Sequence, residues 1–273
     1  MKKQIKLSEI RVCVKGGGDI ASGVIWRLHQ CGFRVFITEI DQPMAVRRKV
    51  SFCEAIYDGN TVVEGIEASR LSQVDDIDKI WEQRKIPILV DPDCEAKSVI
   101  KPDVIIDAIL AKKNICTTIN DAPLVIALGP GFEAGKDVHF VVETNRGHNL
   151  GHLLLSGSAE PNTGIPGPVQ GITTERVLRA PADGLWKNAM DIGDTIRKGD
   201  LVGSVTGIPV KAQINGVLRG LIRPEINVKT GLKIGDIDPR GRKDYCDTIS
   251  EKALAISGGV LEGILRYYVN LDC

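Results

Sequence analysis

The sequence predicts an α/β protein with an N-terminal Rossmann-like, doubly wound domain, a C-terminal barrel-sandwich β module and a final helix. Three observations lead to this prediction. Short apolar runs alternate with segments of helical periodicity up to about residue 128, a glycine-rich turn follows the first run, and an internal repeat occupies residues 177–238. Strand–helix alternation is typical of a parallel sheet with helices on both faces.

The first domain is expected to span residues 1–135 and to bind a ligand. Several of its candidate strands are apolar throughout, as expected for parallel strands that are covered on both faces. The strands are expected at residues 10–16, 33–39, 60–65, 86–91, 103–110 and 123–129. Between them, apolar residues recur at helical spacing from Ile20 to Leu28 and from Leu71 to Trp81.

Residues 136–175 form a loop-rich segment. One strand is expected at 138–144, and glycine, proline and asparagine surround it. Long irregular segments in compact domains are usually functional or disordered. Because this segment is rich in Glu, Asn, Arg and His, we expect it to contribute side chains to a binding site.

Residues 176–240 contain the internal repeat, which predicts a small β module. The stretch "APADGLW" aligns with "AQINGVL" 32 residues later, and Gly199 aligns with Gly231 at the same offset. Each half is expected to fold as strand, turn and strand, so that two interlocked halves form a barrel-sandwich like that of biotinyl and lipoyl domains. Those carriers place a modified lysine at the hairpin between the halves. The hairpin here, residues 205–210, has no lysine at its tip, so a swinging-arm carrier is not expected.

Residues 241–273 are expected to contain a helix over 248–269 that packs back on the N-terminal domain. Thr248 or Ser250 could cap its start, and Glu251 would complete a capping box from Thr248. The pair Gly258-Gly259 in its middle predicts either a break or the close approach of another backbone.

Composition excludes several classes of partner. Lys+Arg and Asp+Glu number 35 each and aromatic residues make up 4%, so neither nucleic acid nor an acidic membrane surface is expected as a partner. We find no apolar run of about 20 residues and no secretory signal. The seven cysteines include no C-x-x-C pair, which favours free thiols and a cytoplasmic location. Self-association into a homo-oligomer is left open.

The turn Gly16-Gly17-Gly18-Asp19 is the first candidate site. It follows a predicted strand and opens a predicted helix, which is the context of a dinucleotide-binding turn, and Glu39 ends the next strand where an acid would take a ribose hydroxyl. Asp19 would cap the helix but would repel a phosphate. The alternative is a glycine turn that serves only strand–helix packing.

Two further stretches could complete a phosphate-binding cleft. Arg47 and Arg48 are expected at the carboxyl end of the sheet, where they could clamp phosphate, unless they lie on a solvated basic face. Gly129-Pro130-Gly131 directly follows an apolar strand and could share the same pocket, unless it is a simple turn.

The loop-rich segment supplies polar candidates for the same ligand. They are Glu143, Asn145, Arg146, His148, Glu160 and Asn162. His148 and His152 are four residues apart, but Gly147 and Gly151 argue against a helix there, so no metal site is expected.

No catalytic residue can be assigned, because no nucleophile elbow, triad order or carboxylate pair stands out. Cys246, in a polar stretch before the last helix, is the one candidate for a reactive thiol, since a helix N-terminus can lower the pKa of a thiol.

Several long segments together resemble the YqeB-type family. They include "KGGGDIASGVIWRLHQCGF", "TEIDQPMAVRRKVSF", "DAPLVIALGPGF", "VVETNRGHNLGH", "GSAEPNTGIPG" and "CDTISEKALAISGGVLEGIL", and the resemblance runs from about residue 11 to 268. Members of this family are described as accessory proteins of selenium-dependent molybdenum hydroxylases. The resemblance implies a role in the maturation of enzymes of the xanthine dehydrogenase type, with such a hydroxylase as the client protein.

Two functions follow as expectations. The first is an accessory factor that binds a phosphorylated cofactor, either the molybdopterin cofactor or a nucleotide. The alternative is an NAD(P)-dependent oxidoreductase that uses the same glycine turn, with His148 or Lys112 as the proton donor. A pure scaffold is a third reading, and whether the chain is an enzyme is left open.

Overall fold

The computed structural model describes residues 6–269, which form two compact units. The second unit comprises Met44–Val50 and Thr163–Thr248, and the first unit comprises the rest of the described chain. The outermost parts of the expected first and last segments, residues 1–5 and 270–273, lie outside the described residues.

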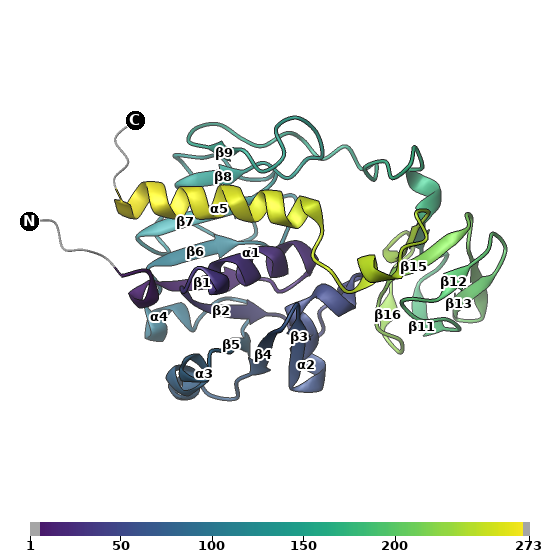
Figure 1. Cartoon of the computed structure of the whole chain (residues 1–273), viewed down its shortest axis with the longest axis horizontal. Coiled ribbons are helices and arrows are strands. Elements are labelled where there is room, and N and C mark those ends of the chain that lie inside the picture. Colours follow the sequence, from purple (N-terminus) through teal and green to yellow (C-terminus); the bar gives the residue numbers. More distant parts are fainter. Residues whose placement is uncertain (1–5, 270–273) are drawn as a thin grey trace, which may run out of the picture. The chain divides into compact units, whose positions relative to one another are not determined.

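A nine-stranded mixed sheet forms the first unit, in the order β3-β4-β5-β2-β1-β6-β7-β8-β9 (Figure 1). The strands are β1 (Arg11–Lys15), β2 (Arg34–Glu39), β3 (Asn60–Val63), β4 (Ile66–Arg70), β5 (Ile86–Val90), β6 (Val104–Asp107), β7 (Leu124–Leu128), β8 (Phe140–Val142) and β9 (Leu153–Leu154). Neighbours from β4 to β8 are parallel, whereas β3 and β9 pair antiparallel at the two edges.

The helices of the first unit are short, apart from α1 and α5. They are α1 (Asp19–Gln30), α2 (Ala55–Asp58), α3 (Ile77–Glu82), α4 (Lys97–Ile100) and α5 (Glu251–Val269). In Figure 1, α1 and α5 lie side by side over one face of the sheet, and they touch where Gly23 meets Ala253. On the opposite face, buried residues of α3 and α4 pack with those of β1, β2 and β6.

The predicted fold class is wrong for the first unit. A doubly wound domain alternates parallel strands with covering helices, whereas this sheet is mixed, and in the described chain no helix lies between β6 and β7 or between β7 and β8. The apolar runs misled the prediction because a strand buried under loops has the same composition as one buried under helices. The polar strand β4 has no apolar run at all and was missed.

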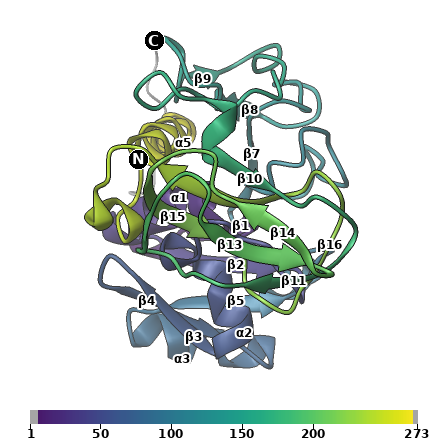
Figure 2. The ribbon, with the colours of Figure 1, turned by 90° about the vertical axis from the view of Figure 1, so that its right-hand side faces the viewer.

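Two four-stranded antiparallel sheets form the second unit, in the orders β10-β17-β15-β12 and β14-β13-β11-β16 (Figure 2). The strands are β10 (Val177–Arg179), β11 (Gly184–Asn188), β12 (Thr195–Ile196), β13 (Leu201–Val205), β14 (Ile208–Lys211), β15 (Gly216–Leu221), β16 (Asn227–Val228) and β17 (Lys233–Asp238). Their apolar side chains enclose a core around the fully buried Trp186.

The prediction of a biotinyl-like barrel-sandwich is also wrong, because these two sheets form antiparallel half-barrels. The repeat itself is visible in the pairing: Gly184 begins β11, which pairs with β13 and β16, and Gly216 begins β15, which pairs with β12 and β17. A repeated strand–turn–strand pattern therefore specified local hairpins without specifying how the two halves close.

Helix α5 runs unbroken through Gly258 and Gly259. Of the two expectations for this glycine pair, the break is therefore wrong, and the close approach of another backbone is confirmed. A side chain at Gly259 would overlap the carbonyl oxygen of Gly151, whereas nothing lies within 4 Å of the position a side chain would take at Gly258. Among residues 6–269, no helix is long and apolar enough to cross a membrane.

We predict opposite effects of alanine at these two neighbouring positions. Gly259→Ala should lower the free energy of unfolding by about 1–3 kcal/mol, because the added methyl group collides with rigid backbone. Gly258→Ala should raise it by about 0.5–1 kcal/mol, since alanine is the better helix former and meets open space. Urea unfolding of the two variants beside the parent measures both values, and equal effects would contradict the close contact with Gly151.

Candidate functional site

Most of the residues predicted for the site lie at one edge of the large sheet. Parallel strands end at the same edge, so the loops after β1, β2, β7 and β8 meet there. These loops carry Gly16–Asp19, Glu39, Gly129–Gly131 and Glu143–His148. We call this side of the first unit the carboxyl edge.

A buried charge cluster, which sequence reasoning missed, supports the carboxyl edge. Lys15 ends β1 and lies opposite Asp107, which ends β6. The Lys15 ammonium donates to Thr117 Oγ1 at 2.6 Å, this hydroxyl donates to Asp107 Oδ2 at 2.6 Å, and the ammonium lies 3.8 Å from the same carboxylate oxygen. All three residues are buried, with at most 3% of their surface exposed. A lysine and an aspartate that each end an apolar strand were the available signal.

The loop after β6 brings a thiol to this cluster. Asn114 holds the loop by accepting from the Thr117 amide at 2.9 Å and donating to the Thr117 carbonyl oxygen at 2.7 Å. Cys116, the preceding residue, is exposed, and its sulfur lies 3.5 Å from the Lys15 ammonium. The Lys15 ammonium therefore donates a hydrogen bond to this sulfur as well as to Thr117.

The glycine turn approaches other parts of the protein. A side chain at Gly16 would begin 3.2 Å from the Ala108 carbonyl oxygen, and one at Gly17 would begin 2.9 Å from the Cys53 amide nitrogen. Only Gly18 faces open space. This geometry supports the alternative reading, in which the first two glycines serve packing.

Glu39 engages the same turn directly. Its carboxylate accepts from the Gly17 amide at 2.8 Å and from the Ile40 amide at 2.9 Å. Burial raises the pKa of Glu39, although both hydrogen bonds oppose the shift. Because the Gly17 amide already has an acceptor, the turn lacks one of the donors that a dinucleotide pyrophosphate would use.

The second glycine turn also makes backbone contacts. A side chain at Gly131 would begin 2.6 Å from the backbone of Lys113, and one at Gly129 would overlap the Thr144 hydroxyl. The turn that includes Pro130 therefore supports the loop after β6 and the end of β8.

The loop after β8 is organised by a buried carboxylate. Glu143, 3% exposed, accepts from the Asn145 amide at 2.6 Å and from the Glu160 amide at 2.7 Å. The Glu160 side chain accepts from Asn145 at 2.5 Å and from Asn149 at 3.2 Å, and these two hydrogen bonds lower the pKa of Glu160. Glu143 thus fixes the backbone, while the amide side chains lie at the surface.

Three predicted residues of this segment are more exposed. Arg146 forms an ion pair with Glu251 at 2.5 Å, with 37% of the arginine side chain exposed, and His148 and Asn162 are exposed residues. Among residues 6–269, no group of three or more potential ligands could hold a metal ion.

The two predicted arginines belong to the second unit. Arg47 is buried and donates to the carbonyl oxygens of Tyr245 and Thr248, each at 2.8 Å. Arg48 donates to the Leu221 carbonyl oxygen at 2.8 Å and to Asp191 at 2.9 Å. These contacts fix the segment Met44–Val50 within the second unit.

Cys246 lies in the core of the second unit and is 1% exposed. Burial, and then the neighbouring Asp247, raise the pKa of its thiol. A buried thiol with a raised pKa is a poor nucleophile, so the environment does not support a reactive Cys246.

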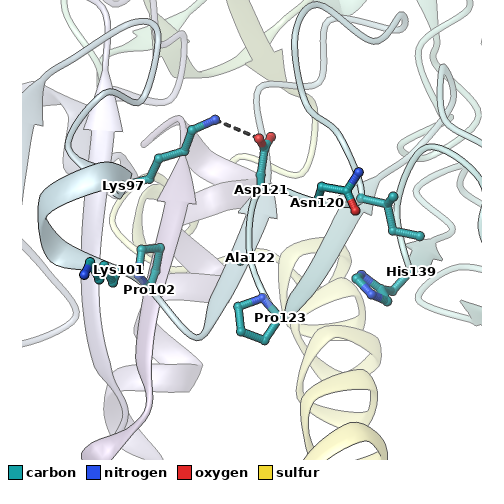
Figure 3. Close-up of a pocket in the computed structure, with 9 residues that line it drawn as sticks. Lys97, Lys101, Pro102, Asn120, Asp121, Ala122, Pro123 and His139 are labelled. Carbon is teal, nitrogen blue, oxygen red and sulfur yellow. Dashed lines mark hydrogen bonds and ion pairs between the residues drawn. The ribbon is translucent and has the colours of Figure 1, made fainter.

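A separate cavity of about 480 Å³ lies near residues that precede β6, β7 and β8 (Figure 3). Lys97 and Asp121 line it and form an ion pair at 2.7 Å, and His139 lies on the other side of the pocket. Burial lowers the pKa of His139, and the Val125 amide donates to its Nδ1 at 3.0 Å, so the neutral ring carries its proton on Nε2. No predicted site residue lines this cavity.

The packing role of the glycine turn can be tested with adjacent substitutions. Gly17→Ala should lower the free energy of unfolding by about 1–3 kcal/mol, because the Cys53 backbone blocks the added methyl group. Gly18→Ala should leave it within about 0.5 kcal/mol of the parent, since the space beside Gly18 is open. Chemical denaturation gives both numbers, and a neutral Gly17→Ala would argue against the Cys53 contact.

The buried cluster predicts a large effect at Lys15. Lys15→Met should lower the free energy of unfolding by about 3–5 kcal/mol, because it leaves the buried Asp107 without its cation. Replacing both partners, as in Lys15→Met/Asp107→Leu, should recover a substantial part of this loss. Lys112→Met is the matched control, and this exposed lysine of the loop after β6 should change stability by less than about 0.5 kcal/mol. Denaturant midpoints distinguish these cases, and a double variant less stable than Lys15→Met would refute the pairing.

Comparisons with known proteins give a relative that is similar in sequence and several solved structures that resemble this chain only remotely. No family model matches the chain. The chain is 46% identical over 254 residues to the "Uncharacterized protein YqeB" of Escherichia coli (strain K12), an alignment that covers 93% of this chain and 47% of that protein. The chain therefore spans about half the length of this curated relative.

The similar solved structures are remote. An aspartoacylase family protein from Mesorhizobium loti shares 12% identity with a TM-score of 0.27, covering 85% of this chain and 86% of that one. A succinylglutamate desuccinylase/aspartoacylase from Rhodobacter sphaeroides shares 15% with a TM-score of 0.27, covering 84% of each. The E. coli tRNA N6-threonylcarbamoyladenosine dehydratase shares 11% with a TM-score of 0.29, covering 96% and 89%.

Likenesses with such low TM-scores carry no argument about this chain. The alignment with YqeB extends over 93% of this chain, and the name of that protein assigns no activity. The comparisons thus support a YqeB-type relationship for this chain and leave its function to be argued from the site.

Proposed function

We propose that this chain is an accessory factor in the maturation of selenium-dependent molybdenum hydroxylases of the xanthine dehydrogenase type, and that it binds a phosphorylated cofactor at the carboxyl edge. The cofactor is a molybdopterin form or a nucleotide. The maturation role is suggested by the resemblance of the sequence motifs to the YqeB-type family. The 46% identity to YqeB supports a relationship to that family.

One observation carries the ligand-binding part of the proposal. Exposed basic side chains follow the carboxyl ends of two parallel strands, with Lys112 and Lys113 after β6 and Arg146 after β8. Ligands of open α/β sheets bind beyond the carboxyl ends of the strands. Arg146 can exchange its exposed ion pair with Glu251 for a phosphate, which its guanidinium can bind through two parallel hydrogen bonds.

The acids of the glycine turn direct the phosphate away from that turn. The Glu39 carboxylate already accepts the hydrogen bond of the Gly17 amide, and Asp19 begins the adjacent helix. A phosphate at this turn would therefore meet two carboxylates. This arrangement disfavours the NAD(P)-dependent alternative, which requires the pyrophosphate at the helix start. We therefore place the phosphate between the loops after β6 and β8.

Ligand binding is tested by thermal unfolding of the full chain with NAD, NADP, ATP, GTP, CDP and molybdopterin forms. A ligand that binds only the folded state should stabilise it by about 2.7 kcal/mol at one hundred times its Kd. Arg146→Ala should weaken binding by about tenfold or more, since it removes a charge-assisted hydrogen bond. Arg34→Ala is the matched control, because Arg34 begins β2 at the opposite edge and forms a similarly exposed pair with Asp78.

Two outcomes would overturn the binding proposal: a shift with NAD or NADP alone, or no shift with any ligand. Equal loss of affinity in Arg146→Ala and Arg34→Ala would move the site away from the loop after β8. The maturation role is tested by producing a client hydroxylase with and without this chain and measuring its bound molybdenum and selenium. Unchanged contents would refute that role even if a ligand binds.

A further inference from the structure

Two buried cysteines from distant parts of the first unit touch each other. Cys13 lies in the middle of β1, and Cys94 lies in the turn that follows β5. Their sulfurs are 3.5 Å apart, and the residues are 0% and 1% exposed. Because β2 lies between β5 and β1, this contact reaches across a strand.

The turn that carries Cys94 holds it in an unusual conformation. Cys94 has a φ of +57°, a left-handed value that residues other than Gly, Asn and Asp seldom adopt. Its amide donates to the Asp91 carbonyl oxygen at 3.2 Å, and the Asp91 carboxylate accepts from the amides of Glu95 and Ala96. These bonds direct the Cys94 side chain to Cys13.

The surroundings make the two thiols unequal. The hydrogen bond from Cys13 lowers the pKa of Cys94 despite burial, and Thr38 and the nearby Lys15 ammonium lower it further. Burial and the proximity of Cys94 raise the pKa of Cys13. Cys94 is thus the thiol that ionises first and attacks first.

We propose that Cys13 and Cys94 form a dithiol–disulfide redox site whose oxidant is a low-molecular-weight disulfide. The Cys94 thiolate attacks one sulfur of the disulfide RSSR and expels RS⁻, which leaves a mixed disulfide on Cys94. The Cys13 sulfur already lies against Cys94, so despite its raised pKa it can lose its proton, attack the Cys94 sulfur and expel the second RS⁻. Two electrons pass from the cysteine pair to RSSR, and the two thiol protons convert the leaving groups to two RSH.

Access to the pair comes through the turn. Exposed residues Asp93 and Glu95 flank Cys94, and the proposal requires that local opening of the segment 91–96 exposes its sulfur. Oxidation would tie this turn covalently to β1, close to Lys15 at the carboxyl edge. The inference is independent of the proposed cofactor, since it uses only the geometry of the thiols.

The test is oxidation of the full chain with oxidised glutathione, followed by alkylation and peptide mass mapping. Cys273→Ser is present in every sample, so that only thiols of the described residues are followed. We expect a Cys13–Cys94 disulfide that dithiothreitol reverses. The exposed Cys31 and Cys116 should instead carry glutathione, whereas the buried Cys53 and Cys246, which have no sulfur partner among the described residues, should stay reduced.

Single substitutions test the order of the steps. In Cys13→Ser, Cys94 should retain glutathione as a mixed disulfide, because no second thiol displaces it. In Cys94→Ser, Cys13 should stay reduced, and in the control Cys53→Ser the Cys13–Cys94 disulfide should form as in the parent. The parent mapping decides the proposal even if a serine variant fails to fold.

Three results would overturn the proposal. Cys13 and Cys94 could remain reduced while Cys31 and Cys116 react. Cys94 could join Cys116 in place of Cys13. Cys53 and Cys246 could become modified at the same rate as the pair, which would show that global unfolding had exposed all the thiols.

Discussion

The buried contact of Lys15, Thr117 and Asp107 is the interaction on which the carboxyl edge depends. An ammonium and a carboxylate in a protein interior are tolerated only when each is paired and hydrogen-bonded. Here the pair joins the ends of two central strands, and Thr117 adds the loop after β6 to them. The loop after β6 is therefore held at the carboxyl edge, beside the loops that follow the other parallel strands. Cys116, which belongs to this loop, is held there too.

Backbone contacts at the glycines extend the same constraint to neighbouring loops. Gly16 and Gly17 let the turn after β1 lie against Ala108 and Cys53, and Gly131 lets the turn after β7 lie against Lys113. Both turns look like phosphate-binding loops in the sequence, because close backbone approach requires glycine whether the neighbour is a ligand or another loop. The hydrogen bond from Gly17 to Glu39 distinguishes the two cases.

Sequence reasoning located the features that depend on neighbouring residues and missed those that depend on residues far apart in the chain. The apolar runs located the strands from β1 to β8 with the exception of the polar β4, and strand ends located the residues that gather at the carboxyl edge. The mixed edges of the sheet, the partners of Arg47 and the contact of Cys13 with Cys94 depend on residues far away in the chain. No local pattern encodes such partners, so composition and spacing could not supply them.

Buried and exposed side chains have different roles at the carboxyl edge, and only the exposed ones can contact a ligand. Buried groups such as Glu143 and Lys15 already have partners within the protein, and they fix backbone positions. In the proposed site, recognition of the ligand would therefore depend on exposed side chains, of which Arg146 and the two lysines after β6 are basic. The formal net charge of the whole chain is zero, so in the proposed site an anion would be attracted by the exposed cations themselves and not by a general field. In the proposed function these exposed cations hold a phosphorylated group, because guanidinium and ammonium groups donate charge-assisted hydrogen bonds to phosphate oxygens.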